Sequence, residues 1–145
     1  MRTSISVVVI TKNEAARLQA CLESVHGWAE EIIVVDDEST DATREIARAF
    51  TDKIFVRRMD IEGRHRNWAY ANASCEWVLS LDADERLTPV LREEVTAAVT
   101  QDSSDVNAYT IPRKNFLGNY WLRWGGQYPS AQLKLFRKAR FRWEE

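Results

Sequence analysis

Hydrophobic and polar residues follow one another along the chain in blocks that predict strands and helices in turn. The first apolar block, ISVVVIT at 5–11, is a run of β-branched residues, which is typical of a strand covered on both faces. A second such run, EIIVVDD, spans 31–37. Between the two runs, apolar residues recur at the spacing of one face of an amphipathic helix, at Leu18, Cys21, Leu22 and Val25.

The alternation continues to about residue 105. The next segments predict helix, strand, helix and strand, at 39–50, 53–59, 63–74 and 76–84. A last helix is expected over 88–99, because Thr88 is a favourable N-cap and Pro89 a favourable first helical residue. After residue 105 the pattern changes, and residues 107–143 show strands and loops rich in aromatic residues, without a clear helix.

Strands that alternate with helices predict a three-layer α/β domain with a mainly parallel central sheet. The chain has 145 residues, no internal repeat and no low-complexity linker, so we expect a single domain over 1–145. It contains no apolar stretch near the ~20 residues that a membrane-spanning helix needs.

The charge is unevenly distributed, although the net charge is only −2. From residue 113 onward there are eight Lys and Arg against two Glu, a local net charge of +6, so the first 112 residues carry −8. Such a basic segment fits an anionic partner, such as a diphosphate, a phosphorylated glycan or a membrane surface, and equally fits a solvated sheet edge. Cys21 and Cys75 are too isolated for a disulfide framework and indicate a reducing cytosol. His26 and His65 show no metal-ligand spacing and are expected at the surface.

Acidic residues stand at the ends of two predicted strands. Asp36 and Asp37 close one of them, and Asp82 and Asp84 follow the apolar run VLSL. In an open parallel sheet, ligands bind beyond the carboxyl ends of the strands. An Asp-x-Asp pair there can present oxygens to Mg²⁺ or Mn²⁺ and leave positions for substrate phosphates. A solvated acidic turn is the alternative for this pair alone.

Three segments together resemble family 2 glycosyltransferases with the GT-A fold: ISVVVITKNEA, EIIVVDDESTDAT and RHRNWAYANASCEWVLSLDADERL. The later segment GGQYPSAQLKLFRKARFRW resembles the branch that adds glucose or a similar sugar to the lipopolysaccharide core. The resemblance implies a Rossmann-like nucleotide-sugar-binding half over 1–105 and the start of an acceptor side over 106–145. It implies an inverting transfer from a nucleotide-diphosphate sugar, typically a UDP-sugar, to a glycan acceptor in lipopolysaccharide core or cell-envelope polysaccharide biosynthesis.

Matched position by position, the resemblance implies a nucleotide pocket at the ends of the first two strands. Thr11, Asn13 and Glu14 would line this pocket. Asp36 or Asp37 would accept a hydrogen bond from the imide N–H of the base.

The resemblance also implies roles for the middle of the chain. Arg66 and Asn67 match a segment that lies against the nucleotide-sugar. Asp82 would contact the ribose or the metal, and Asp84 would bind the Mg²⁺ or Mn²⁺ ion on the diphosphate, while Glu85 supports the turn.

An inverting displacement needs a carboxylate base to deprotonate the acceptor hydroxyl. In the resembled family this residue lies well after the metal motif, often next to a His, whereas this chain ends in FRWEE. We therefore expect either Glu144 or Glu145 to be the base, or a base beyond residue 145 on an acceptor side that this chain lacks. The expected partners are the sugar donor and a glycan or lipid-linked glycan, without nucleic acid, in the cytoplasm or at the inner face of the cytoplasmic membrane.

Three other hypotheses about the function stay open at this point. VVDDE resembles the acidic pocket of phospho-accepting receiver domains, but here a complete strand and helix precede it. A nucleotidyltransferase would carry a Gly-rich basic loop after the first strand, and TKNEAARL has no glycine. A nucleotide-sugar-binding module without turnover has the same sequence features as an enzyme.

Overall fold

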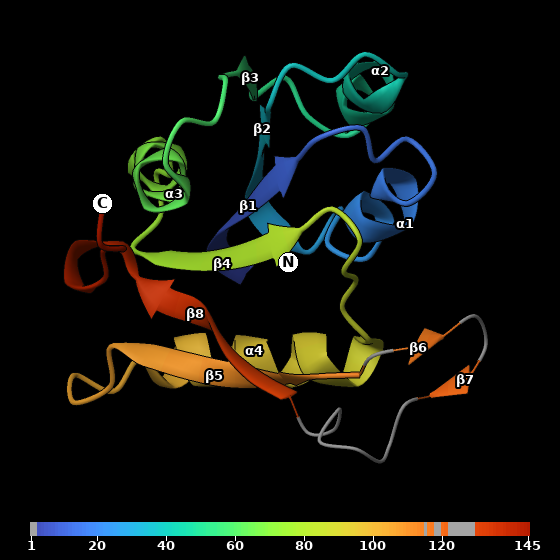
Figure 1. Ribbon diagram of the computed structural model, residues 1–145. Helices are drawn as coiled ribbons and strands as arrows, with labels where there is room; N and C mark the ends of the chain where they lie inside the picture. Colours follow the sequence, from blue (N-terminus) through green and yellow to red (C-terminus); the bar gives the residue numbers. More distant parts are fainter. Residues whose placement is uncertain (1–2, 115, 118–119, 122–129) are drawn as a thin grey trace.

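The computed structural model describes residues 3–114, 116–117, 120–121 and 130–145. Its main sheet has six strands in the order β3-β2-β1-β4-β8-β5 (Figure 1). The first four in this order are parallel, and they are β3 (Ile54–Val56), β2 (Ala29–Asp36), β1 (Thr3–Thr11) and β4 (Trp77–Asp82). The expected mainly parallel α/β sheet is therefore confirmed.

Two later strands extend the sheet in the opposite sense. β8 (Ser130–Arg137) runs antiparallel to β4, and β5 (Ala108–Arg113) runs antiparallel to β8. A separate two-stranded pair consists of β6 (Phe116–Leu117) and β7 (Tyr120–Trp121), and a short 3₁₀ helix, Lys138–Arg140, follows β8. Most of the segment GGQYPSAQ lies outside the described residues.

Helices cover both faces of the sheet, which gives the three expected layers. α1 (Leu18–Glu23), α2 (Thr43–Arg48) and α4 (Pro89–Gln101) pack on one face, and α3 (Glu62–Ala71) packs on the other (Figure 1). The predicted start of α4 is confirmed, because the Thr88 hydroxyl accepts the backbone N–H of Leu91 at 3.2 Å. None of the helices in the described part of the chain is long and apolar enough to cross a bilayer.

β1 is buried on both faces. Val7 and Val9 belong to the core beneath α1, α2 and α4, while Val8 belongs to the core beneath α3. All three side chains are fully buried, as are those of Ile5 and Ser6. The β-branched run thus fills both cores, and polar ligands can be placed only at the ends of the strand.

The amino ends of the strands are joined by one buried carboxylate. Glu31 on β2 accepts the hydroxyl of Ser6 on β1 and the backbone N–H of Ser74, just before β4. Lys53, just before β3, donates to its other oxygen. Burial alone would raise the pKa of Glu31, but these donors lower it to about 2.

We predict that Glu31→Gln removes a pH-dependent part of the stability. A carboxyl whose pKa falls from 4.5 to about 2 on folding stabilises the folded state fully above about pH 4.5, and this contribution is lost as the pH falls towards 2. At pH 7 the variant should lose about 3 kcal/mol of unfolding free energy. Urea denaturation over a pH series measures the difference from the wild type.

Glu30→Gln is the matched control, because Glu30 is the exposed neighbour on the same strand. It should change the unfolding free energy by less than about 0.5 kcal/mol. A Glu31→Gln effect that stayed constant from pH 7 to pH 2 would contradict the role given to the carboxylate.

Candidate functional site

A pocket lies beyond the carboxyl ends of β1 and β4. Ile10 on β1 stands beside Asp82 on β4, and Thr11 stands beside Asp36 on β2. The chain passes from β1 to β2 on one side and returns to β4 on the other, so this is the point where the strand order switches. The pocket has a volume of about 290 Å³ and is lined by Ile10, Thr11, Lys12, Glu14, Asp37, Met59, Asp82, Ala83 and Asp84.

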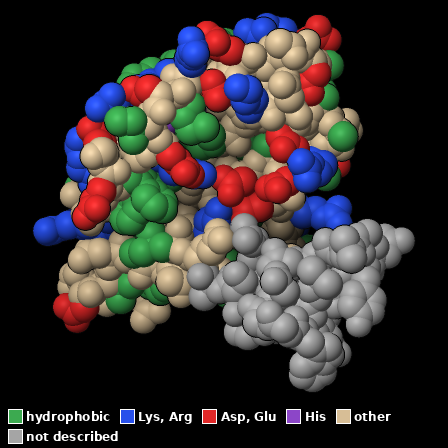
Figure 2. Space-filling model, viewed as in Figure 1, with side chains coloured by type: hydrophobic (Ala, Val, Ile, Leu, Met, Phe, Trp, Pro, Cys, Tyr) green, Lys and Arg blue, Asp and Glu red, His purple; other side chains and the backbone are tan. Residues whose placement is uncertain are grey.

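The pocket is acidic. Four of its lining residues are carboxylates, whereas Lys12 is the one cation among them in the described part of the chain. Figure 2 shows acidic side chains gathered in the middle of this face, with Lys and Arg side chains around them. The site therefore favours a cationic ligand, or an anionic ligand that brings a cation with it.

The structure separates the two adjacent aspartates. The buried carboxylate of Asp36 accepts the backbone N–H of Ser39 at 2.9 Å and the Ser39 hydroxyl, and it lies 3.7 Å from Arg44. Asp37 lines the pocket instead, where its Oδ1 accepts the backbone N–H of Met59 at 3.0 Å. Of the two candidates, Asp37 can meet a ligand and Asp36 shapes the loop.

Asn13 joins the loops that follow β1 and β2. Its backbone is left-handed (φ 50°), its N–H donates to the Ser39 hydroxyl at 2.8 Å, and its side-chain oxygen accepts the N–H of Thr40 at 2.8 Å. The neighbouring Glu14 does line the pocket, and its carboxylate pairs with Arg17. Asn13 thus holds the rim of the pocket, while Glu14 faces the space inside.

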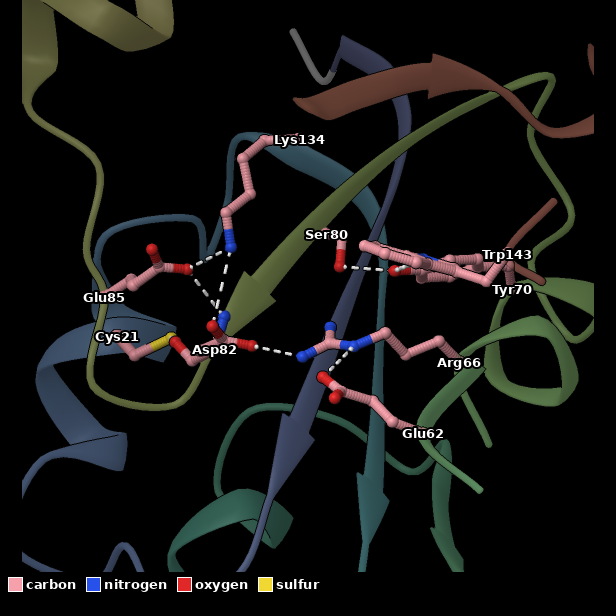
Figure 3. Close-up of polar contacts among 9 residues, drawn as sticks. All are labelled: Cys21, Glu62, Arg66, Tyr70, Ser80, Asp82, Glu85, Lys134 and Trp143. Carbon is pink, nitrogen blue, oxygen red and sulfur yellow. Dashed lines mark hydrogen bonds and ion pairs between the residues drawn. The ribbon is translucent and has the colours of Figure 1, made fainter. Parts of the chain in front are cut away.

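Asp82 lies between two cations. Arg66 on α3 donates to its Oδ1 at 3.1 Å, and the Nζ of Lys134 on β8 lies 3.6 Å from its Oδ2 (Figure 3). Burial would raise the pKa of Asp82, but Lys134 and Arg66 hold it below its usual range. The carboxylate is therefore charged and paired at neutral pH.

Glu85 completes this arrangement. Its Oε1 accepts the Lys134 ammonium at 2.7 Å and the backbone N–H of Asp82 at 2.8 Å. Beneath the same turn, the Cys21 thiol points to the carbonyl of Asp82 at 3.7 Å, and burial raises the pKa of this thiol to about 12. Glu85 supports the turn, as the resemblance implied, and it also holds Lys134.

Asp84 is more open. Its side chain is 48% exposed, and one of its oxygens lies 3.9 Å from the Arg17 guanidinium. In the described part of the chain no three His, Cys, Asp or Glu side chains lie close enough together to hold a metal ion. One or two aspartates at the pocket still fit Mg²⁺ or Mn²⁺ that takes its remaining ligands from substrate phosphates and water.

Asn67 faces away from the pocket and fixes the C-terminal segment to α3. Its side-chain amide donates to the Trp143 carbonyl at 2.9 Å and to Glu145 at 3.2 Å, and its oxygen accepts the Trp143 N–H at 2.8 Å. The segment approaches α3 closely, because a Cβ on Gly63 would lie 1.9 Å from the Glu144 carbonyl oxygen. In this arrangement Asn67 contacts protein groups.

The two candidate bases differ in their surroundings. Glu145 accepts hydrogen bonds from Asn67 and from Arg142 at 2.9 Å, and lies 3.8 Å from Arg64. Glu144 is exposed and lines a shallow surface depression that the last four residues form. Neither residue lines the acidic pocket.

Lys134 is a site residue that the sequence analysis did not identify by itself. The sequence places it only within the basic segment that begins at residue 113. A lysine between apolar neighbours in a strand, LKLF, was the available signal, because a buried lysine needs an anionic partner. The surface position expected for His65 is wrong: it is fully buried, and its Nδ1 lies 2.9 Å from Arg57.

The model of a protein family, "Glycosyl transferase family 2", matches residues 6–144. The chain is 30% identical to the lipopolysaccharide core biosynthesis glycosyltransferase LpsC of Rhizobium meliloti, over 97% of this chain and 53% of LpsC. It is 38% identical to an uncharacterized glycosyltransferase of Rickettsia bellii, over 70% of this chain and 34% of that protein. The chain thus spans about a third to a half of the length of these relatives.

Solved structures share the fold. The crystal structure of S. aureus TarS 1–349 in complex with UDP-GlcNAc superposes with a TM-score of 0.59 at 25% identity, over 93% of this chain and 45% of TarS 1–349. The mannosyltransferase PcManGT from Pyrobaculum calidifontis, in complex with GDP-Man and Mn²⁺, gives 0.60 at 23% identity, over 78% of this chain and 36% of PcManGT.

We predict that the two aspartates of the Asp-x-Asp pair differ in their effect on stability. Asp82→Asn removes the carboxylate that lies between Arg66 and Lys134 and should lower the unfolding free energy by about 1–2 kcal/mol, a value reduced for the partial exposure of Asp82. Asp84→Asn should change it by less than about 0.5 kcal/mol. Urea denaturation at pH 7 measures both, and equal losses would show that Asp82 is not the paired residue.

Proposed function

Since the chain belongs to glycosyl transferase family 2, we propose that it is the donor-binding part of an inverting glycosyltransferase that uses a nucleotide-diphosphate sugar, with UDP as the nucleotide. The observation that carries this proposal is the acidic pocket at the strand-order switch, lined by Thr11, Asp37, Asp82 and Asp84. Ligands of open α/β sheets bind at this position.

The proposed nucleotide position is supported by the polar groups of Thr11 and Asp37. The Oγ1 of Thr11 is buried and has no hydrogen-bond partner in the described part of the chain. Asp37 keeps Oδ2 directed toward Lys12, 3.6 Å away, while Oδ1 is held by the Met59 N–H. Asp37 can therefore accept the imide N–H of uracil, and Thr11 lies one strand away to meet the same nucleoside.

Asp84, with Asp82 beside it, would hold Mg²⁺ or Mn²⁺ on the donor diphosphate. The ion would supply positive charge to the diphosphate as the bond to the sugar breaks. The residues of the chain orient the donor: Asp37 holds the base, Asp84 lies at the open side, and Lys12 stands at the pocket wall. The structure of the mannosyltransferase PcManGT in complex with GDP-Man and Mn²⁺ supports the choice of a divalent metal ion.

For the acceptor we propose a lipid-linked or lipopolysaccharide-core glycan at the inner face of the cytoplasmic membrane. The likeness to LpsC over 97% of the chain supports this class. A carboxylate base must deprotonate its hydroxyl, and both Glu144 and Glu145 are exposed, but Glu145 is paired with Arg142 and Arg64. We therefore favour Glu144, or a residue of a longer protein, over Glu145.

A nucleotide-sugar-binding module without turnover is the second candidate. It is favoured by the position of the two candidate bases, because neither Glu144 nor Glu145 lines the acidic pocket. Both candidates bind the donor, and only the enzyme transfers or hydrolyses it.

We predict that UDP binds better than GDP or CDP, and that Mn²⁺ strengthens its binding at least tenfold. Asp84→Asn should abolish the strengthening by Mn²⁺, because the residue lies at the ligand edge and not in the core. Calorimetric titration of each nucleotide, with and without Mn²⁺, measures this.

Asp52→Asn is the matched control for this titration. Asp52 is exposed and precedes β3, at the end of the sheet opposite to the pocket, so this variant should bind UDP and Mn²⁺ like the wild type. If Asp84→Asn also bound them like the wild type, the assignment of the metal site would be wrong. Release of the sugar from a UDP-sugar separates the enzyme from the binding module.

A further inference from the structure

The carboxylate of Asp82 already has a cation on each side. Arg66 comes from α3, and its second contact is Glu62, 3.1 Å from its Nε. Lys134 comes from β8, and it bridges Asp82 and Glu85 (Figure 3). Both cations are largely buried, with 14% and 11% of their side chains exposed, so the pairs are poorly screened by solvent.

The two cations differ in their freedom to move. Arg66 is held by two carboxylates and by the ring of Trp143, whose centroid lies 5.9 Å from the guanidinium carbon. Lys134 contacts Asp82 at 3.6 Å, which is a looser contact than its 2.7 Å bond to Glu85. A lysine ammonium is a point charge on a flexible four-carbon stem, so Lys134 can leave Asp82 without breaking its bond to Glu85.

A divalent cation at Asp82 would meet the charge of Lys134. Like charges a few ångström apart in a poorly solvated site repel strongly, so the bare cation binds weakly while Lys134 stays in place. A diphosphate adds negative charge to the same site and gives the ammonium a new partner. The diphosphate therefore offsets the repulsion between the metal ion and the Lys134 ammonium, so each of the two ligands favours the binding of the other.

We propose that Lys134 is a positioning residue that serves as the counter-ion of Asp82 in the donor-free protein, so that a divalent cation binds there only together with an anionic diphosphate. This inference rests on the proposed donor site. It assigns to Lys134 the coupling between metal and nucleotide: each ligand strengthens the binding of the other by the same factor. A methionine at position 134 carries no charge, so the variant loses the part of this coupling that comes from the Lys134 ammonium.

The test measures Mn²⁺ binding without any reaction, from the electron paramagnetic resonance signal of free Mn²⁺. In the wild type, Mn²⁺ alone should bind at least tenfold more weakly than in the presence of saturating UDP. In Lys134→Met, Mn²⁺ alone should bind about tenfold more tightly than in the wild type, and saturating UDP should strengthen Mn²⁺ binding by a smaller factor than in the wild type. Lys134→Arg keeps the charge and should behave like the wild type.

Lys138→Met is the matched control. It removes a lysine just after β8, beside the amino end of β4 and so away from the pocket, where the ammonium donates to the Ala73 carbonyl. This variant should bind Mn²⁺ and UDP like the wild type. If Lys134→Met does not fold because Glu85 has lost the Lys134 ammonium, the double variant Lys134→Met with Glu85→Gln removes both charges and should show the same gain over Glu85→Gln alone.

The outcomes separate this inference from the proposed function. No binding of UDP by the wild type, with or without Mn²⁺, overturns both. Metal-dependent UDP binding by the wild type, together with Mn²⁺ binding to Lys134→Met that is no tighter than to the wild type, overturns the counter-ion role alone. Tight UDP binding by the wild type without Mn²⁺, lost in Lys134→Met, would show that Lys134 replaces the metal ion and would also overturn it.

Discussion

The burial of the middle of β1 on both faces is the constraint on which the rest of the structure depends. Val7 and Val9 occupy one core and Val8 the other, so the middle of the sheet has no room for polar chemistry. On the neighbouring strands β2 and β4, charged residues stand only near the two ends of the strands. At the amino ends they are satisfied by one another around Glu31, and at the carboxyl ends they surround a pocket.

Charged side chains have different partners at the amino ends and at the carboxyl ends of the strands. Glu31 has only protein partners, so its carboxylate joins strands and leaves nothing for a ligand. Asp82 is also paired, but 34% of its side chain remains exposed, and one of its partners is a flexible lysine. A paired and fully buried carboxylate stabilises a fold, whereas a paired carboxylate at a pocket wall can exchange its partner.

Arg66 connects this pocket to the C-terminal segment. It contacts Asp82 on one side and the Trp143 ring on the other, while Asn67, the next residue of α3, bonds to the Trp143 backbone. The aromatic rings of Tyr70, Phe136 and Phe141 pack together beneath this segment. The Arg66 guanidinium therefore joins the Trp143 ring to the carboxylate of Asp82.

The sequence predicts well the elements that depend on local pattern. The β-branched runs of β1 and β2 and the Thr88-Pro89 helix start needed no tertiary information. The sequence could not decide between Asp36 and Asp37, because that choice depends on a turn in which Ser39 captures Asp36. Nor could the sequence pair Lys134 with Asp82, because β8 lies beside β4 in the sheet but follows it in the chain only after α4 and β5. His65 was misplaced because its burial depends on the packing of α3 against the sheet, which its spacing does not report.

The late return of β8 has a consequence for how the protein is made. β4 can pair with β1 as soon as it leaves the ribosome, but the partners of its other edge, Leu135, Phe136 and Arg137, are translated 56 to 60 residues later. At ordinary rates of synthesis this leaves a largely apolar strand edge uncovered for about 3 to 12 seconds. An uncovered edge of this kind is a template for pairing with other chains, so the nascent protein is exposed to such pairing until β8 has been synthesised.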